Sequence, residues 1–186
     1  MKKFITALML AATLGFGFES QAESVAGKIL LWPANRIMDA LDIFSISLGV
    51  GNTVRIELMA TEAVKVGAGI GTEFSLVKDY NRQYGVAMTN GWYWSLITAQ
   101  QGNLERVALC GTVKSYQEEI RGYIDPATDP TFDFYEGERD YWRIGGALGL
   151  LVDGELYLHP VEIADFVAGI FFIDLRADDY SMDSFE

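Results

Sequence analysis

The side chains that most often carry chemistry are scarce in this sequence of 186 residues, which contains one His and one Cys. A site with two His ligands, a Cys2His2 zinc site and an internal disulfide are therefore all excluded. The formal net charge of -12 also argues against a nucleic-acid partner, because phosphate binding depends on Lys and Arg. The remaining candidates for a functional site are single residues and short motifs.

His159 is the main candidate for a general base. It precedes Pro160 at the start of a predicted C-terminal helix, with Glu155 and Glu162 close in sequence. The local sequence places no hydroxyl or thiol nucleophile beside it. The pattern favours a capping role, in which the ring binds backbone N–H groups of the helix. A hydrolase that uses His159 is the alternative.

Residues 64–71, which include Gly67, Gly69 and Gly71, are the closest match to a phosphate-binding loop. A dinucleotide-binding turn needs a third Gly where this chain has Thr72, followed at once by a helix. Here the apolar alternation continues through the glycines, so we expect a strand and no cofactor. Because Gly leaves one face of that strand bare, we also expect sharp coiling or the close approach of another element.

The negative charge is concentrated in residues 118–186, which hold 17 acidic residues against four Arg. We expect an acidic, solvated surface there. One acidic stretch could bind Ca²⁺, which takes oxygen ligands, but it lacks the spacing and central Gly of a calcium loop. Its residues are Asp125, Asp129, Asp133, Glu136, Glu138 and Asp140. A solvated loop is the favoured interpretation.

Two further features lie in predicted strands. Cys110 stands in the apolar stretch 107–113 and is expected to be a buried, inert thiol. Trp92 and Trp94 share one strand face and Tyr93 takes the other, which suits an apolar ligand site, a membrane-interface girdle or a core pair with one partly exposed ring. We predict no catalytic, cofactor-binding or metal-binding residues.

The first 22 residues have the features of a secretory signal peptide: a charged start at Lys2-Lys3, an uncharged stretch over 4–18 and a cleavage site at Ser20-Gln21-Ala22. A transmembrane anchor is the alternative, but the stretch is shorter than the ~20 residues a span needs. We therefore predict a signal peptide over 1–22 and a single α+β domain over 23–186, exported to the periplasm or associated with the outer membrane.

Alternating apolar residues predict an antiparallel meander. Residues 44–50, 54–60 and 64–70 repeat with the two-residue period of a half-buried strand, and Gly51-Asn52 supplies a turn. A late hairpin is expected to turn at Asp153-Gly154. Further strand-like pieces lie at 74–77, 84–88, 92–97, 106–114 and 142–152. We expect a coiled sheet or a small open barrel.

Two helices should accompany this sheet. A short one opens at Pro33, with Ile37 and Leu41 on its apolar face. The second covers 160–175, and its wide apolar surface is expected to be buried by packing on the sheet, with insertion at a membrane surface as the alternative. Its polar residues form a narrow stripe: Glu162, Asp165 and Gly169.

Several segments together carry a resemblance. They are Asn35-Arg36, Asp39, Leu41-Asp42-Ile43-Phe44, Gly49-Val50-Gly51, Ala60-Thr61, Val66-Gly67-Ala68-Gly69 and His159-Pro160-Val161-Glu162-Ile163-Ala164-Asp165-Phe166. In them the chain resembles a group of uncharacterised exported bacterial envelope proteins with a Gly-rich β-meander and a C-terminal apolar helix. The resemblance implies an envelope location and carries no activity or site residues.

The predicted function is that of a non-enzymatic exported cell-envelope protein, a structural or binding module. The alternative is a small carrier that holds an apolar ligand or lipid between the Gly-faced sheet and the C-terminal helix. An integral outer-membrane barrel would need strands of about 9–11 residues, and the predicted strands are mostly shorter. The expected partner is an envelope protein or a lipid, with peripheral membrane association allowed and no nucleic acid.

Overall fold

The computed structural model describes residues 25–123, 127–132, 137–176 and 179–180. They fall into two units: the described part of the first is 25–31 with Tyr180, and the second is 32–179. The whole sheet and the C-terminal helix belong to the second unit. The predicted signal peptide lies outside the described residues.

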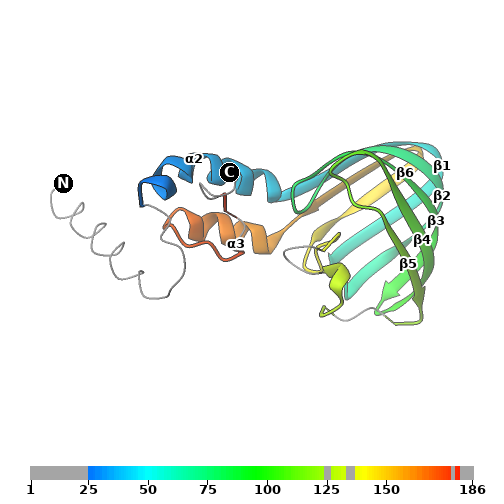
Figure 1. Cartoon of the computed structure of the whole chain (residues 1–186). Helices are drawn as coiled ribbons and strands as arrows, with labels where there is room; N and C mark the ends of the chain where they lie inside the picture. The colour runs from blue at the N-terminus through cyan, green and yellow to red at the C-terminus, as the bar shows by residue number, and fades with distance from the viewer. Residues whose placement is uncertain (1–24, 124–126, 133–136, 177–178, 181–186) are drawn as a thin grey trace. The chain divides into compact units, whose positions relative to one another are not determined.

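A helix, a six-stranded antiparallel sheet and a second helix follow one another along the chain (Figure 1). The elements are α2 Val25–Asp42, β1 Phe44–Thr61, β2 Val64–Asp79, β3 Gln83–Ile97, β4 Ala99–Gly111, β5 Tyr116–Arg121, a 3₁₀ turn Pro130–Phe132, β6 Ile144–Leu158 and α3 Pro160–Gly169. The strand order is β5-β4-β3-β2-β1-β6. This architecture confirms the predicted α+β class with an open antiparallel meander and a helix before and after it.

The strands are longer than the sequence indicated. β1 has 18 residues, β2 16, β3 15, β4 13 and β6 15, so the expectation of mostly short strands is wrong. The reason is that strands run on through positions predicted as turns. Gly51-Asn52, for example, lies inside β1 and stays paired with β2.

The long strands bend, and their bends lie in register. The pairing of β1 with β6 is interrupted between Val50 and Val54. Between them Thr53 pairs with Gly71 of β2, which in turn pairs with Gly91 of β3. Both glycines have a φ of 137°, which side chains with a Cβ rarely adopt. Figure 1 shows the strands curving round together at one end of the sheet, so the predicted sharp coiling is present.

β6 folds back on itself at Leu151, whose φ is 65°. A Cβ built on Gly145 would lie 2.1 Å from the carbonyl oxygen of Leu156, and one built on Gly149 would lie 2.1 Å from Oδ2 of Asp153. The two halves of β6 therefore lie side by side. The turn comes before Asp153-Gly154, the position predicted for it.

The buried face of this sheet is the polar one. Along β1, Leu48 and Ile56 are each 61% exposed, whereas Ser47 and Glu57 are 4% and 3% exposed. The outward residues of β1, β2 and β6 that are large and apolar are Ile46, Leu48, Val50, Val54, Ile56, Leu58, Val64, Val66, Ile70, Phe74, Leu76, Ile144, Leu148, Leu150, Leu151, Val152, Leu156 and Leu158. These three strands are therefore apolar outside and polar inside, whereas the outward residues of β4 and β5 include polar ones such as Gln101, Glu105 and Glu119.

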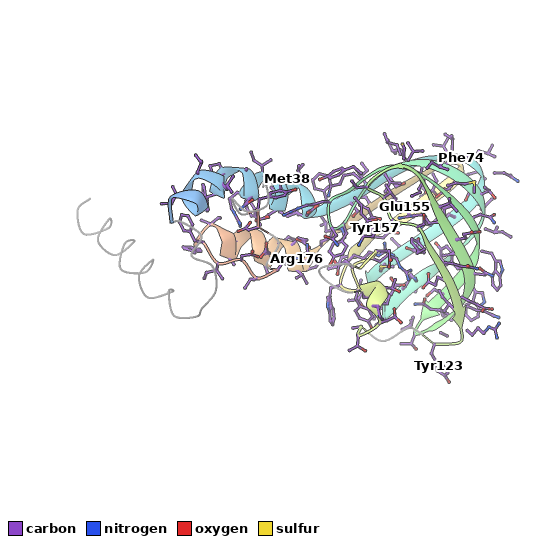
Figure 2. All side chains as sticks on the ribbon, viewed as in Figure 1. Met38, Phe74, Tyr123, Glu155, Tyr157 and Arg176 are labelled. Atoms are coloured by element: carbon purple, nitrogen blue, oxygen red, sulfur yellow. The ribbon has the colours of Figure 1, made fainter. Side chains whose placement is uncertain are left out.

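Figure 2 shows Phe74 on the outside of the curved sheet, with Glu155 and Tyr157 within it. Phe74 is 51% exposed, and Tyr157 is 1% exposed. A buried apolar cluster is small in the described part of the chain and consists of Val77, Ala87 and Val113, with Ala108 packed against it. Apolar packing thus accounts for little of the interior.

The helix α3 also buries its polar side and exposes its apolar side. Its acidic stripe is buried, with Glu162 2% and Asp165 1% exposed, whereas Ile163 and Val167 are 41% and 49% exposed. The expectation that the apolar surface of this helix would be buried is therefore wrong. The physical reason is that its polar side faces charged partners, because Arg176 binds Glu162 at 2.5 Å.

The helix α2 begins at Val25, so Pro33 lies inside it and does not open it. Ile37, on the face predicted to be apolar and packed, is 62% exposed, and Asp39 is 2% exposed. Trp32 of α2 belongs to the second unit, as α3 does, and it donates a hydrogen bond of 2.9 Å from Nε1 to the carbonyl oxygen of Gly169. This part of α2 is therefore in direct contact with α3.

Replacing Gly71 by Ala should lower the free energy of unfolding by about 2–4 kcal/mol, because the Cβ would lie 2.1 Å from a backbone oxygen at a φ reserved for Gly. Gly154→Ala is the matched control, since its nearest neighbour would be Leu48 Cδ2 at 3.9 Å, and it should change stability by less than about 1 kcal/mol. Denaturant titration measures both. Equal losses would contradict a bend that depends on Gly71.

Candidate functional site

The inward side of the sheet encloses a charged interior. A cavity there is lined by side chains from β1, β2, β3, β4, β5 and β6 and from the segment before β6, among them Arg55, Glu73, Tyr93, Arg143 and Glu155. These residues alternate with the outward apolar ones, so the two-residue strand period places them together. Buried charges must be paired to be tolerated, and most of them are.

Two buried arginines are each held by one carboxylate. Arg106 Nη1 lies 2.9 Å from Asp79 Oδ2, and Arg139 Nη1 lies 2.7 Å from Glu118 Oε2. Burial disfavours the charged guanidinium, but the neighbouring acidic groups outweigh it and raise the pKa of Arg106 and of Arg139 above the ordinary value. Both guanidiniums are therefore cationic at neutral pH, and although burial opposes this, Arg106 in turn lowers the pKa of Asp79.

Glu62, between β1 and β2, is held by a cluster of cations. Lys65 Nζ lies 2.5 Å from Oε1 and Arg143 Nη2 lies 3.5 Å from Oε2. Burial by itself would raise the pKa of Glu62, but Lys65, Arg143 and Arg139 lower it to about 2. Glu62 thus stabilises the fold as a carboxylate.

A second network joins β1, β3 and β6. Arg55 donates from Nε to the Tyr93 hydroxyl at 3.0 Å, and its Nη1 binds Glu155. Tyr157 donates its hydroxyl proton to Glu57 Oε1 at 2.7 Å. The chemistry available here is hydrogen bonding and charge neutralisation, and it links strands that are distant in sequence.

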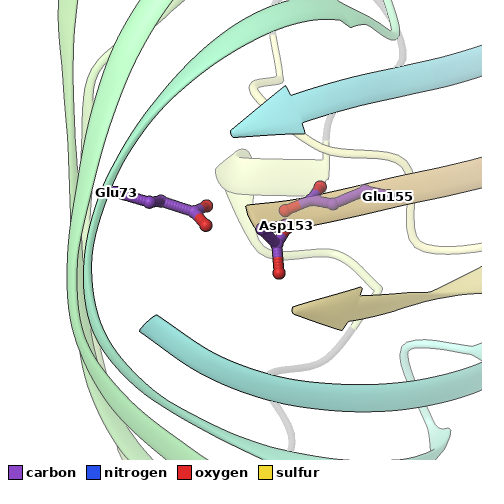
Figure 3. Close-up of side chains that lie close together, drawn as sticks. All are labelled: Glu73, Asp153 and Glu155. Atoms are coloured by element: carbon purple, nitrogen blue, oxygen red, sulfur yellow. The ribbon is translucent and has the colours of Figure 1, made fainter. Parts of the chain in front are cut away.

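Two carboxylates, Glu73 and Asp153, form the exception to this pairing, and they lie beside Glu155, which Arg55 binds (Figure 3). Glu73 of β2 reaches toward Asp153 and Glu155 of β6, and their oxygens lie within 4.8 Å of one another. Asp153 is 1% exposed, yet neither of its carboxylate oxygens has a hydrogen-bond partner, and Glu73 Oε2 has none either. The nearest cation to Asp153 is Arg55, whose Nη1 lies 3.9 Å from Oδ1. We call these residues the acidic cluster.

Crowding affects the protonation of this cluster. Burial is the main cause that raises the pKa of Glu73 to about 7, with repulsion from Asp153 and Glu155 adding to it. Burial likewise raises the pKa of Asp153 to about 6, although Arg55 opposes the shift. Oxygen ligands in this arrangement suit a hard cation.

The interior also contains a Ser, a His and an Asp in contact. His159 is fully buried; its Nε2 lies 2.6 Å from Ser45 Oγ and its Nδ1 lies 2.8 Å from Asp140 Oδ2. Ser45 donates its single proton to Asp79 Oδ1 at 2.8 Å, and Arg106 holds Asp79 ionised. The Ser45 proton is thus directed at Asp79 and not at Nε2, so the ring does not prepare the serine hydroxyl as a nucleophile.

The role predicted for His159 is therefore corrected. Its side chain makes no capping hydrogen bond to α3, because both ring nitrogens are engaged by side chains. Of the two acids considered as its partners, Glu162 binds Arg176 and Glu155 binds Arg55. The ring instead ties the start of β1 to the segment before β6.

Cys110 and the aromatic residues of β3 can also be placed. Cys110 is exposed, so the prediction of a buried thiol is wrong. The reason is that β5 pairs with Gln101–Arg106 of β4, and among the described strands none covers the last residues of β4 on that side. Trp92 and Trp94 do share one face, but it is the outward one, at 41% and 42% exposed, while Tyr93 is buried.

Several of the described acidic residues of the C-terminal third lie inside the protein. Asp129 accepts the backbone N–H of Thr131 at 2.9 Å, and Asp140 binds His159, whereas Asp125, Asp133 and Glu136 lie outside the described residues. The buried ones are Glu118, Asp140, Asp153, Glu155, Glu162 and Asp165. For these residues the expected solvated surface is wrong, because buried Arg and His side chains and backbone N–H groups bind many of them.

The Gly-rich face of β2 looks into the charged interior. A Cβ on Gly67 would meet the backbone of Glu57, and one on Gly69 would lie 2.6 Å from the ring of Tyr93. The second of the expected outcomes, close approach of another element, is thus also observed. The structure does not bring α3 to this face, where an apolar ligand would have been held between them.

No protein-family model, curated protein or solved structure matches this chain. Among the described residues, no helix is long and apolar enough to cross a membrane.

Sequence reasoning missed the acidic cluster. The signal was present in the two-residue period, since Asp153 and Glu155 share one strand face and Glu73 lies on the face opposite Phe74. What the period could not show is that these two strands bring their polar faces together.

Glu62→Gln should lower the free energy of unfolding by about 2–3 kcal/mol at pH 7, because it removes a carboxylate whose pKa is lower in the folded than in the unfolded state. That contribution is complete above the unfolded pKa of about 4.5 and is lost as the pH falls toward 2. Denaturant titrations from pH 7 to pH 2.5 should therefore show wild type and variant converging. A constant difference across this range would contradict the ionised assignment of Glu62.

His159→Ala should destabilise the fold by about 2–4 kcal/mol, since Asp140 and Ser45 would lose a buried partner. Because the Ser45 hydroxyl is committed to Asp79, a serine-directed fluorophosphonate should leave it unmodified. Mass spectrometry of the treated protein checks this. Modification of Ser45 that disappears in His159→Ala would instead indicate a hydrolase.

Proposed function

We propose that this protein is a non-enzymatic cell-envelope protein, a structural or binding module, whose curved sheet lies in lipid with its apolar outer face against the hydrocarbon. The observation that carries the proposal is the inverted burial of the sheet. None of the described outward positions of β1 and β6 holds a charged residue, and the charges of these strands all point inward.

The outward apolar residues form one continuous surface. Ile56, for example, pairs with Ala68 on one side and Leu148 on the other, and Ile56 and Leu148 are 61% and 70% exposed. Soluble monomers rarely expose contiguous apolar patches beyond a few hundred Å². In lipid the same surface is favourable, and many of the charged side chains of the inner face are paired.

The apolar surface has a defined height. It ends at the bend, where the outward residues Asn52, Thr72 and Asn90 pair across three strands and Thr72 donates to Asn90 at 2.6 Å. The straight part of β1 over 54–61 is eight residues, or roughly 26 Å at ~3.3 Å per residue, close to the ~25 Å band of strand-built membrane proteins. Trp92, next to the bend, stands where an aromatic belt would lie.

A lipid environment explains this surface better than a protein partner does. Protein interfaces keep polar groups at the rim and hydrogen bonds through the patch, whereas the outward surface of β6, β1 and β2 is apolar on three adjacent strands. The polar outward residues, such as Gln101, Glu105 and Glu119, lie on β4 and β5. The predicted signal peptide and the resemblance to exported envelope proteins support a location in the periplasm or at the outer membrane. Both are predictions from the sequence and are independent of the burial argument.

The expected result in cells that export the protein is that it stays with the membrane fraction through carbonate extraction. Ile56→Lys should reduce retention and, in bilayers, lower the free energy of unfolding by about 2–4 kcal/mol, the effect of a cation near the bilayer midplane. In water, the same change at an exposed position would alter stability by only about 0.5 kcal/mol.

Asn52→Lys is the matched control, because Asn52 is outward and exposed on the same strand but lies in the polar row. It should leave retention and stability unchanged. Release of the wild type by carbonate, with Ile56→Lys neutral, would refute the proposal and leave a soluble binding module or carrier.

A further inference from the structure

We infer that the acidic cluster of Glu73, Asp153 and Glu155 binds one hard divalent cation, for which Ca²⁺ is the best fit. This inference is separate from the proposed function, since it concerns the interior of the sheet and holds whether the outer face meets lipid or not.

The geometry of the oxygens fits a single ion. They lie within 4.8 Å of one another, and two ligands on opposite sides of a Ca²⁺ ion at about 2.4 Å are separated by about that distance. Carboxylates are ligands of both Ca²⁺ and Mg²⁺, but Mg²⁺ demands a near-ideal octahedron, whereas Ca²⁺ tolerates variable coordination. Three carboxylates from two strands therefore favour Ca²⁺.

The buried and unpartnered oxygens point to a missing ligand. Asp153 is 1% and Glu73 is 4% exposed, yet Asp153 Oδ1 and Oδ2 and Glu73 Oε2 lack hydrogen-bond partners. Leaving a buried carboxylate without partners is strongly unfavourable. The other carboxylates of this interior, such as Glu62, Asp79 and Glu118, are each bound by a Lys or Arg side chain, so these oxygens stand out as ones whose partner is not a protein group.

The charges balance for a divalent ion. Arg55, which binds Glu155, is the cation within reach of the cluster, because Arg106 is held by Asp79 and Arg139 by Glu118. Three carboxylates and one guanidinium leave two negative charges. A divalent cation neutralises them.

The site also has room for an ion and its water. Glu73 and Glu155 line the interior cavity, so water can complete the coordination that three carboxylates leave open. Gly149 lies against Asp153, where a Cβ would overlap Oδ2 at 2.1 Å. A side chain at that position would push the Asp153 carboxylate out of the cluster.

Calorimetric titration of the exported full chain with CaCl₂, after removal of metals with EDTA, tests the inference. We expect one ion per chain with a Kd on the order of 10⁻⁴–10⁻³ M, the range of extracellular calcium sites, and a rise in Tm with 10 mM CaCl₂. Glu73→Gln and Asp153→Asn should each weaken binding at least tenfold and abolish the rise in Tm.

Glu105→Gln is the matched control, because Glu105 is an exposed, outward carboxylate of β4, and it should bind as the wild type does. No binding by the wild type would overturn the inference. Equal binding by Glu73→Gln would overturn it as well, and would indicate adventitious contact with surface acids. If Asp153→Asn does not fold, the result with Glu73→Gln decides. If carbonate releases the protein and the protein still binds Ca²⁺, the proposed lipid-embedded sheet is refuted and the cation site is not.

Discussion

The structure depends on the pairing of buried charges between strands. With a buried apolar cluster as small as Val77, Ala87 and Val113, the interior is held mainly by ion pairs and hydrogen bonds. A buried charge without a partner is far more costly than a missing apolar contact. The positions of Arg106, Arg139 and the other interior cations therefore dictate which strands can lie next to one another.

The proposed lipid environment would favour this mode of stabilisation. In water, the exposed Leu, Ile and Val residues would favour a collapsed state in which they are buried and the charges are outside. When hydrocarbon surrounds the sheet, that alternative loses its advantage, and the paired charges become the groups most in need of shielding. Inverted burial, long strands and an interior of ion pairs are thus consequences of one constraint.

The order of the elements was predictable from the sequence, but which face of the sheet is buried was not. Alternation at 44–50 and 64–70 indicates a strand with two unlike faces, and it is silent on which face is buried. The indication lay in the polar positions, because Arg55, Glu57 and Lys65 have opposite charges that can pair, as an enclosed face requires and a solvated one does not. The helices followed the same rule, with Asp39 and Glu162 inside.

The contacts of His159 could not be predicted from the sequence, for a different reason. His159 meets Ser45 and Asp140 from positions 114 and 19 residues away, and no local pattern contains that information. Cys110 was predicted to be buried because its neighbours are apolar, a rule that fails wherever apolar side chains face outward. The errors share one origin, the assumption that apolar side chains are buried and polar ones exposed.

The bend that ends the apolar outer surface also brings together the carboxylates of the acidic cluster. Glu73 lies two residues after Gly71, and Asp153 lies two residues after Leu151, the points at which β2 and β6 turn. Curvature at these points brings carboxylates together that straight strands would keep apart, and their mutual repulsion opposes the curvature. A cation in the cluster would remove that repulsion and stabilise the bend, so the tip of the sheet and the occupancy of the site are expected to be coupled.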